Sequence, residues 1–368
     1  MIRRRDPRRS ASFFAILAVA ACGSGRQRVP RLPASELGYS DFRVPLPRHF
    51  IFDESGSAVR EDNTPRDNRT TDAGATLGRV LFYDTRLSAN DSISCASCHQ
   101  QQFGFADTAR FSRGLHGART RRHAMALANA RFYQPGRFFR DERAATLEAQ
   151  VLEPIENPIE MGLPLDSLVP KLGSIPYYPS LFRAAFGTPE IDRDRTARAL
   201  AQFVRSLVSD HARIDSIFRG GGPPDTSLLT PQEREGRTLF GGRAGCARCH
   251  RTNAFNLDLP DNIGLDSVET DAGAGDGRFK APALRNVAVR PPYMHDGRFK
   301  TLREVVDFYD HGIRRNPHLD ARLRAPGGAP ARLDLSEAQR DALVAFLMTL
   351  TDRSFLHDAR FSDPFVQP

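Results

Sequence analysis

The chain has 368 residues, which is long enough for two ordinary domains, each with its own hydrophobic core. Its formal net charge of +8 is concentrated at one end, because residues 1–21 hold five arginines and one aspartate, and the remainder carries about +4. A basic stripe for nucleic acid is therefore excluded, no nucleic-acid partner is expected, and charge bears at most on docking to another protein.

The N-terminus has the pattern of a bacterial export signal. A basic stretch from Arg3 to Arg9 precedes a short apolar run from Phe13 to Ala21, which predicts a signal peptide over residues 1–21. Cys22 follows small residues as in a lipobox, so we expect it to carry a lipid; the alternative is an ordinary secretory signal in which Cys22 is incidental. The run is too short to span a bilayer, so membrane contact would be through the lipid anchor only, on the periplasmic side of the envelope.

Residues 22–74 are rich in Pro, Arg, Asp and Asn and show little periodicity, which predicts a tether and a loosely wrapped N-terminal arm. Helical periodicity begins at Ala75 and opens a predicted first domain over residues 75–219. Its apolar face would hold Leu77, Val80, Leu81 and Phe82.

The motif Cys-x-x-Cys-His occurs twice and uses four of the five cysteines. It is the attachment signature of a c-type haem, in which two thiols bind the haem covalently and the histidine ligates the iron. The spacing suits this chemistry because the turn brings both sulfurs to one haem edge and places the imidazole under the metal. We therefore predict two covalently bound haem c groups, one held by Cys95, Cys98 and His99 and the other by Cys246, Cys249 and His250.

Other uses of these cysteines compete with haem attachment. A zinc site built from two Cys-x-x-Cys pairs usually has them ~15–20 residues apart, whereas Cys95 and Cys246 lie 151 positions apart. Structural disulfides and a thioredoxin-like redox pair are further alternatives, but neither requires a histidine directly after both pairs.

Three more helices are predicted in the first half of the chain, with an extended loop that Pro154 and Pro158 impose between the first two. The helices would cover Thr146 to Leu152, Tyr178 to Phe186 and Asp194 to Val208, and the loop Glu153 to Gly162.

A glycine- and proline-rich stretch marks a linker at residues 220–229, followed by a second domain at 230–358 and a tail at 359–368. Capping patterns predict three helix starts in this half: Thr230-Pro231-x-Glu233, Thr301-x-x-Glu304 for a helix through Phe308, and Ser336-x-x-Gln339 for a final helix to Leu350.

A short repeat links the two halves. Gly236-Arg237-x-Leu239-Phe240 leads into the second haem motif as Gly78-Arg79-x-Leu81-Phe82 leads into the first. No convincing strand run is present. The predicted fold is mainly α, with two homologous cytochrome c-like haem domains and long loops.

Several stretches beside the haem motifs resemble the bacterial dihaem cytochrome c peroxidase and MauG superfamily, and the likeness runs from about Ala75 to Leu350. These stretches are Leu87-Ser88, Arg143 to Gln150, Pro154 to Met161, Ala283 to Ala288 and Pro292 to Gly297.

The resemblance implies that the N-terminal haem is the peroxide site and that the C-terminal haem relays electrons from a partner. His99 and His250 would be the proximal ligands. Gln150 and Glu160 match the family's glutamine and glutamate over the peroxide haem and are the expected catalytic residues. Cleavage of peroxide requires a group that moves a proton between its oxygens, which a poorly solvated carboxylate can do. From the sequence alone, a solvated loop charge would be the favoured role of Glu160, and it is the resemblance that favours the catalytic one.

The distal ligands follow from the same resemblance. His116 lies in the loop that holds the family's gating histidine, shifted by about one residue, so it is either that distal ligand or a surface histidine. At the second haem, Tyr309 stands where standard peroxidases have methionine and where MauG has tyrosine, with Met294 and Met348 as competitors. An oxygen ligand favours ferric and higher states, whereas a thioether raises the potential.

Two positions depart from the family. His123 replaces the usual asparagine of an interhaem calcium site, which weakens the expectation of a calcium ion. Arg140 replaces the tryptophan that relays electrons between the haems, and the chain contains no tryptophan. Electrons would then pass by direct tunnelling or through Tyr133 or Tyr293, or transfer would be slow.

The expected function is a dihaem c-type peroxidase that reduces hydrogen peroxide to water with electrons from a small cytochrome c or cupredoxin. One alternative is a MauG-like enzyme that uses peroxide to oxidise an organic or protein substrate. Another is a non-catalytic dihaem electron carrier or sensor, although a carrier needs no proton shuttle. The resemblance also implies a homodimer.

Overall fold

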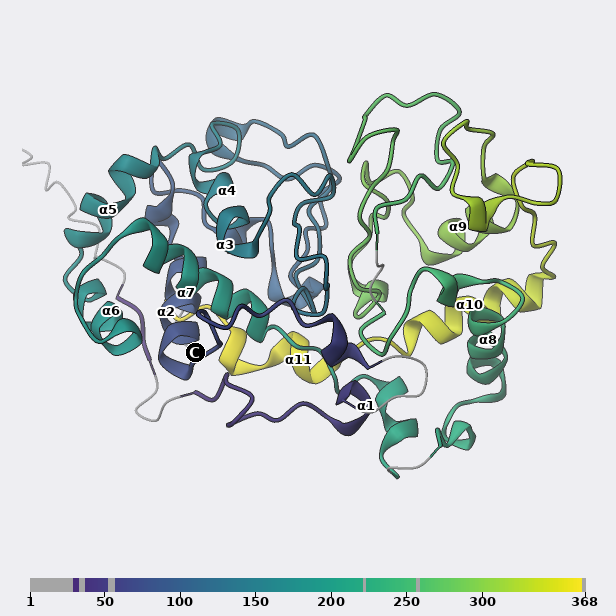
Figure 1. Cartoon of the computed structure of the whole chain (residues 1–368), viewed down its shortest axis with the longest axis horizontal. Coiled ribbons are helices and arrows are strands. Elements are labelled where there is room, and N and C mark those ends of the chain that lie inside the picture. The colour runs from purple at the N-terminus through teal and green to yellow at the C-terminus, as the bar shows by residue number, and fades with distance from the viewer. Residues whose placement is uncertain (1–28, 33–36, 52–56, 221–222, 256–258, 366–368) are drawn as a thin grey trace, which may run out of the picture.

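The computed structural model describes residues 29–32, 37–51, 57–220, 223–255 and 259–365. The predicted signal peptide and Cys22 lie outside these ranges. Two helical halves with long loops lie side by side, α2 to α7 in one and α8 to α10 in the other (Figure 1). Within the described residues, extended pairing is confined to isolated bridges, which confirms the expectation of a mainly α fold.

The α-helices of the described chain are α1 (Arg48–Ile51), α2 (Asp72–Tyr83), α3 (Leu147–Gln150), α4 (Glu153–Glu156), α5 (Leu165–Gly173), α6 (Tyr178–Phe186), α7 (Arg193–Ser206), α8 (Pro231–Gly241), α9 (Leu302–Asp307), α10 (Glu337–Met348) and α11 (Arg353–His357). No helix in these residues is long and apolar enough to cross a membrane.

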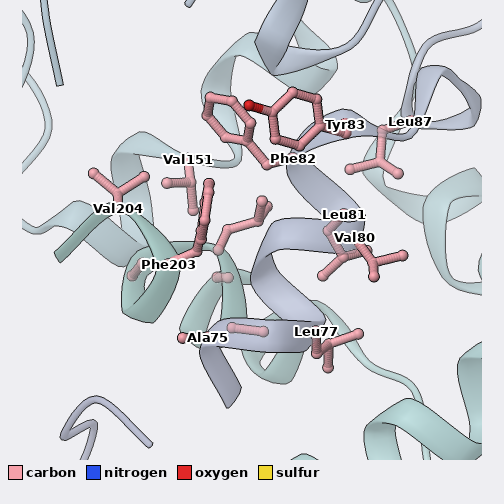
Figure 2. Packing of buried hydrophobic residues seen from close by; sticks show 14 of the residues in the cluster. Ala75, Leu77, Val80, Leu81, Phe82, Tyr83, Leu87, Val151, Phe203 and Val204 are labelled. Atoms are coloured by element: carbon pink, nitrogen blue, oxygen red, sulfur yellow. The ribbon is translucent and has the colours of Figure 1, made fainter. Parts of the chain in front are cut away.

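Helix α2 forms the centre of the first core. Its N-cap is Thr71, whose side chain accepts a hydrogen bond from the Gly74 amide at 3.0 Å, so the helix begins three residues before the predicted start. Leu77 and Leu81 are fully buried, and Figure 2 shows this apolar face together with Phe203 of α7.

The predicted repeat appears in the packing of two helix pairs. A Cβ atom on Gly78 of α2 would lie 2.0 Å from the Ala199 carbonyl oxygen of α7. A Cβ atom on Gly236 of α8 would lie 1.9 Å from the Ala342 carbonyl oxygen of α10. Each glycine therefore permits the same close helix contact ahead of a Cys-x-x-Cys-His motif, which supports a duplicated domain.

At each end of the predicted second domain, a short segment packs in the other half from the one predicted. Ile214 and Ile217, in the 3₁₀ helix η6 (Arg213–Phe218), pack in the second core although they precede the predicted linker. Phe355 and Leu356 of α11 pack in the first core, and Figure 1 shows α11 running back beneath that half. The domain limits at 220–229 and at 358 stay predictions.

The N-terminal arm is packed where it is described. Tyr39 belongs to the first core, and its hydroxyl donates a hydrogen bond to the Arg360 carbonyl oxygen at 2.6 Å. Phe50 of α1 is buried against Phe132 of the first half and Ala254 of the second. The arm therefore helps to hold the two halves together.

The local predictions were right where a cap or a periodic face decided the outcome. Side-chain caps at Thr230, Thr301 and Ser336 begin α8, α9 and α10 as expected, although α10 ends at Met348. Helix α6 has the predicted bounds, and α3 lies within its predicted range. Helix α7 begins one residue before its predicted start and ends two residues before its predicted end.

Three local expectations were wrong. The residues Glu153 to Glu156 form α4 rather than extended chain, because Pro154 lies in the first turn, where its missing N–H costs nothing. Helix α5 was not predicted. Helix α11 follows the helix that was expected to be the last, and Asp352 caps it by accepting the Phe355 amide at 3.0 Å.

Candidate active site

The first Cys-x-x-Cys-His motif forms a compact turn, in which one ring nitrogen of His99 stays available for a metal. Cys95–Ser97 is the 3₁₀ helix η3, and the His99 amide donates to the Cys95 carbonyl oxygen at 2.9 Å. The ring Nδ1 of His99 lies 3.0 Å from the Phe105 carbonyl oxygen. Burial lowers the pKa of His99, which keeps the ring neutral. With Nδ1–H donated to this carbonyl, Nε2 is the atom left for a metal.

The second motif forms the same turn, but the ring of its histidine lacks the hydrogen bond that His99 makes. Cys246–Arg248 is η8, and the His250 amide donates to the Cys246 carbonyl oxygen at 3.0 Å. Burial lowers the pKa of His250 to about 4, against a smaller opposite effect of the Phe255 carbonyl. Nδ1 of His250 is nevertheless buried without a well-formed hydrogen bond.

The cysteine alternatives find no support in the described residues. Cys95, Cys98, Cys246 and Cys249 form no disulfide there. The one described group of three potential metal ligands with suitable spacing, formed by Asp210, His211 and Asp352, contains none of the cysteines.

The first motif opens on a cavity of about 870 Å³, here called the first cavity. Its volume lies in the range of about 300–1,000 Å³ that is usual for sites of small ligands. Four residues predicted to act together line it: Cys98, His99, Gln150 and Glu160. Gln150 is the last residue of α3, and Glu160 lies on the loop after α4.

Glu160 is half-buried in the wall of the first cavity. Burial raises its pKa, the Arg143 charge opposes this rise, the Glu153 charge adds to it, and a hydrogen bond from Asn157 opposes it. The net result is a raised pKa. Such a carboxyl group is suited to take up and release a proton inside the cavity.

His116 does not reach either cavity in this conformation. It is exposed, has a φ of 55° and lies in the turn η5 (Leu115–Gly117). The neighbouring Leu115 amide donates to the Glu160 carbonyl oxygen at 2.9 Å, so this turn rests directly on the segment that holds Glu160. The role of His116 as a distal ligand stays a prediction, and it requires movement of the turn.

The second motif opens on a narrower cavity of about 250 Å³, the second cavity, lined by Cys246, Cys249, His250, Met294 and Tyr309 among others. Tyr309 lies in the π-helical turn η10 (Phe308–Gly312), a distortion that is frequent at functional sites. Burial and the two nearby sulfurs raise its pKa. Met294 stays a competing ligand, whereas Met348 is 58% exposed and lines neither cavity.

The two cavities share one wall, formed by His123, Arg140, Thr270, Asp271, Lys280, Ala281 and Pro282. Arg140 thus lies between the two cavities, and its position between two haems stays a prediction. Tyr133 lines the first cavity and Tyr293 the second. Sequence reasoning missed Lys280, because no pattern around it signals a site.

Comparison with known proteins decides the family. A family model described as di-haem cytochrome c peroxidase matches residues 72–222, and a cytochrome c model matches residues 233–351. The methylamine utilization protein MauG of Methylorubrum extorquens is 37% identical over 298 residues, which cover 78% of this chain and 80% of the relative. The chain belongs to the di-haem cytochrome c peroxidase and MauG family.

Other members are similarly close. The cytochrome c551 peroxidase of Nitrosomonas europaea is 30% identical over 75% of this chain and 79% of its own length. The crystal structure of a MauG-like protein associated with microbial copper homeostasis has a TM-score of 0.72, with 31% identity over 86% of this chain and 99% of its own. Relatives thus include both peroxidases and MauG proteins.

Membership implies haem c, and the described residues fit it. Each motif offers two cysteine sulfurs and a half-buried imidazole, with its pKa lowered, next to a cavity. The histidine Nε2 would ligate the iron, and the two cysteine sulfurs would form the thioether bonds that attach the haem. This family consists of oxidoreductases, and the chain is an enzyme of that class.

Proposed function

We propose that this family member is a peroxidase that reduces hydrogen peroxide to water with electrons from a small cytochrome c or cupredoxin. The observation that supports this most directly is the position of Glu160 and Gln150 on the wall that Cys98 and His99 also line. A bound haem would supply an iron with an open position and a path for electrons. A non-catalytic carrier or sensor would need neither residue.

In this proposal Glu160 moves a proton. It takes the proton from the peroxide oxygen nearer the haem site and returns it to the other oxygen, which leaves as water when the O–O bond breaks. Two electrons from the donor protein and two protons from solvent convert the remaining oxygen to the second water. Its raised pKa allows both halves of this transfer. We expect Gln150, which is half-buried and lines the same cavity, to hydrogen-bond the peroxide and orient it.

A MauG-like reaction is the second candidate, in which peroxide oxidises an organic or protein substrate. Tyr309 on the wall of the second cavity favours it, because an oxygen ligand stabilises oxidised iron. The 37% identity with a MauG protein is a further reason to test it.

The remaining assignments belong to the same proposal. The chain would be exported to the periplasmic side of the envelope, held there by a lipid on Cys22, and would work as a homodimer. A calcium ion between the haems stays a prediction. His123, at the position of the family's calcium-site asparagine, has its Nδ1 3.1 Å from the Ala109 carbonyl oxygen.

The test is peroxide turnover by the haem-loaded protein with a reduced small cytochrome as donor. Glu160→Gln should lower kcat by about 10²–10⁴-fold, the usual contribution of a general acid–base group. Glu156→Gln is the matched control, because Glu156 lies four residues away, is exposed and lines neither cavity.

Each other outcome favours a different function. If the natural chain shows no turnover but peroxide gives a long-lived oxidised species, the MauG-like reaction replaces the proposal. If both haems stay six-coordinate and unreactive, the chain is a carrier or sensor.

A further inference from the structure

Three buried cationic side chains gather at the shared wall of the two cavities. Arg140 and Lys280 line both cavities, and Arg290 lines the second. Their exposed fractions are 8%, 7% and 7%, respectively. Cationic side chains are seldom buried this deeply unless an anion accompanies them.

None of the three has a carboxylate partner among the described residues. Their hydrogen bonds go to backbone carbonyl oxygens only, namely Arg140 Nε to His123 at 3.2 Å, Lys280 Nζ to Arg137 at 2.7 Å, and Arg290 Nη2 to Ala283. Nε of Arg290 is buried and has no hydrogen-bond partner at all.

Two carboxylates near the shared wall are already paired with other arginines. Asp271 accepts two hydrogen bonds from Arg122, each at 2.7 Å. Asp296, whose charge acts on Arg140, forms its own ion pair with Arg298 at 2.9 Å. Lys280 is partly compensated, because the Glu142 charge acts on it and its Nζ lies 3.2 Å from the centre of the Tyr133 ring. Arg140 and Arg290 form no ion pair with a carboxylate among the described residues.

Such an arrangement is unfavourable unless an anion comes from outside the chain. Burial, together with the mutual repulsion of Arg140 and Arg290, lowers the pKa of Arg140 to about 9. Burial lowers the pKa of Arg290 to about 10, against a smaller opposite effect of Tyr293, and that of Lys280 to about 7, against a smaller opposite effect of Glu142. Removing one partner of a buried ion pair is strongly destabilising, so a cluster that lacks a partner in the protein points to a bound anionic group.

The haem supplies anions of the right kind. Attachment through the vinyl groups fixes one edge of the ring and leaves two propionate carboxylates on another edge. A guanidinium binds a carboxylate through two parallel N–H donors, which is the geometry that unsatisfied arginines on a cavity wall can offer.

We propose that Arg140 and Arg290 bind the propionates of the haems where the two cavities meet. Arg140 would then serve both haems, because it lines both cavities. Similar proteins have an aromatic residue that relays electrons at position 140. This chain would instead have a positive charge there, which acts on both haems. The inference depends on haem being bound but not on the reaction with peroxide.

A fixed positive charge beside both haems has a measurable effect. It opposes the extra positive charge of ferric iron, so it raises the midpoint potential of each haem. Because the wall is buried, salt screens this effect only weakly.

The experiment is a spectroelectrochemical titration of both haems in the haem-loaded protein, without peroxide. Arg140→Gln should lower both midpoint potentials, and Arg140→Lys should restore much of the loss because it keeps the charge. Arg213→Gln is the control. Arg213 forms a surface ion pair with Glu233 and lines neither cavity, so both potentials should stay at their natural values.

A structural role alone would not give this pattern of loss and rescue. Unchanged potentials in Arg140→Gln with full haem content overturn the proposal. If that variant fails to retain both haems, Arg290→Gln decides, because Arg290 lines the second cavity only and should lower the potential of one haem. Unchanged potentials in Arg290→Gln would then reject propionate binding. Loss of peroxide turnover is a separate readout and does not bear on this result.

Discussion

Asn157 donates a hydrogen bond from its side-chain Nδ2 to Oε1 of Glu160 at 3.0 Å. Its own Oδ1 accepts the Ile159 amide at 2.9 Å, which fixes the orientation of the Asn157 side chain. Asn157 therefore stabilises the charged form of Glu160, the proposed proton shuttle. The surroundings as a whole favour the neutral form, because the net effect is a raised pKa. Small changes around Glu160 should move its pKa in a predictable direction.

Asn157→Ala should raise the pKa of Glu160, because the carboxylate loses a hydrogen bond. Glu153→Gln should lower it, because a neighbouring negative charge disappears and Arg143, which Glu153 binds at 2.9 Å, is released. If Glu160 must be ionised to accept the peroxide proton, the acid limb of kcat/KM moves to higher pH in the first variant and to lower pH in the second. Shifts in the same direction, or none, would show that this limb belongs to another group.

The two close helix contacts predict matched stability losses. Gly78→Ala and Gly236→Ala each force a Cβ atom against a backbone carbonyl oxygen, so each should lower the free energy of unfolding by at least about 1–3 kcal/mol. Gly241→Ala is the control, since Gly241 closes α8 with nothing within 4 Å of its added Cβ. It should be neutral or slightly stabilising. Urea titration of the haem-loaded protein compares the three, and equal stability of all would mean that the helices move apart at little cost.

Sequence information was sufficient where the chemistry is local. The capping residues Thr230, Thr301 and Ser336 satisfy amides only three positions away, so their helices could be predicted from short patterns. The Cys-x-x-Cys-His turns are local in the same way. The prediction that Gln150 and Glu160 share one site required knowledge of the family, because nothing in the sequence shows that this loop faces a cavity.

Sequence information was insufficient where distant segments meet. Arg140 and Lys280 are far apart in the chain and come together only because the two halves pack at the shared wall. Helix α11 was missed because it is short, and its burial depends on Phe355 and Leu356 returning to the first core. The error at α4 had a different cause. A proline in the interior of a helix breaks it, but Pro154 lies in the first turn, where proline is well tolerated.

A buried ion network joins the arm to the second half and predicts a large loss on mutation. Asp215 accepts hydrogen bonds from Arg285 at 2.5 and 2.8 Å and lies 2.9 Å from Nε2 of His49 in α1. Asp215→Asn leaves Arg285 buried without its counter-charge and should cost about 3–5 kcal/mol. Glu233→Gln removes only a surface pair with Arg213 and should cost about 0–1 kcal/mol.

The same network sets a pH dependence of stability. Burial would raise the pKa of Asp215, but Arg285 and His49 outweigh burial and lower it. The group therefore adds stability above its unfolded pKa of about 3.9, and this contribution is lost as the pH falls through the lower folded value. Thermal unfolding midpoints from neutral to acidic pH should converge for the natural chain and Asp215→Asn below pH ~4. A constant difference at every pH would mean that the loss is one of packing rather than charge.

Tyr309 allows the two candidate reactions to be separated at the second haem. If its oxygen ligates the iron, Tyr309→Met should raise the midpoint potential of that haem, because a thioether favours the reduced state. The same variant should shorten the life of any species that peroxide produces. Met294→Leu is the control, since Met294 lines the same cavity and is the competing ligand. A fall in potential in Met294→Leu, with no change in Tyr309→Met, would assign the ligand to Met294 and remove the reason for a MauG-like reaction.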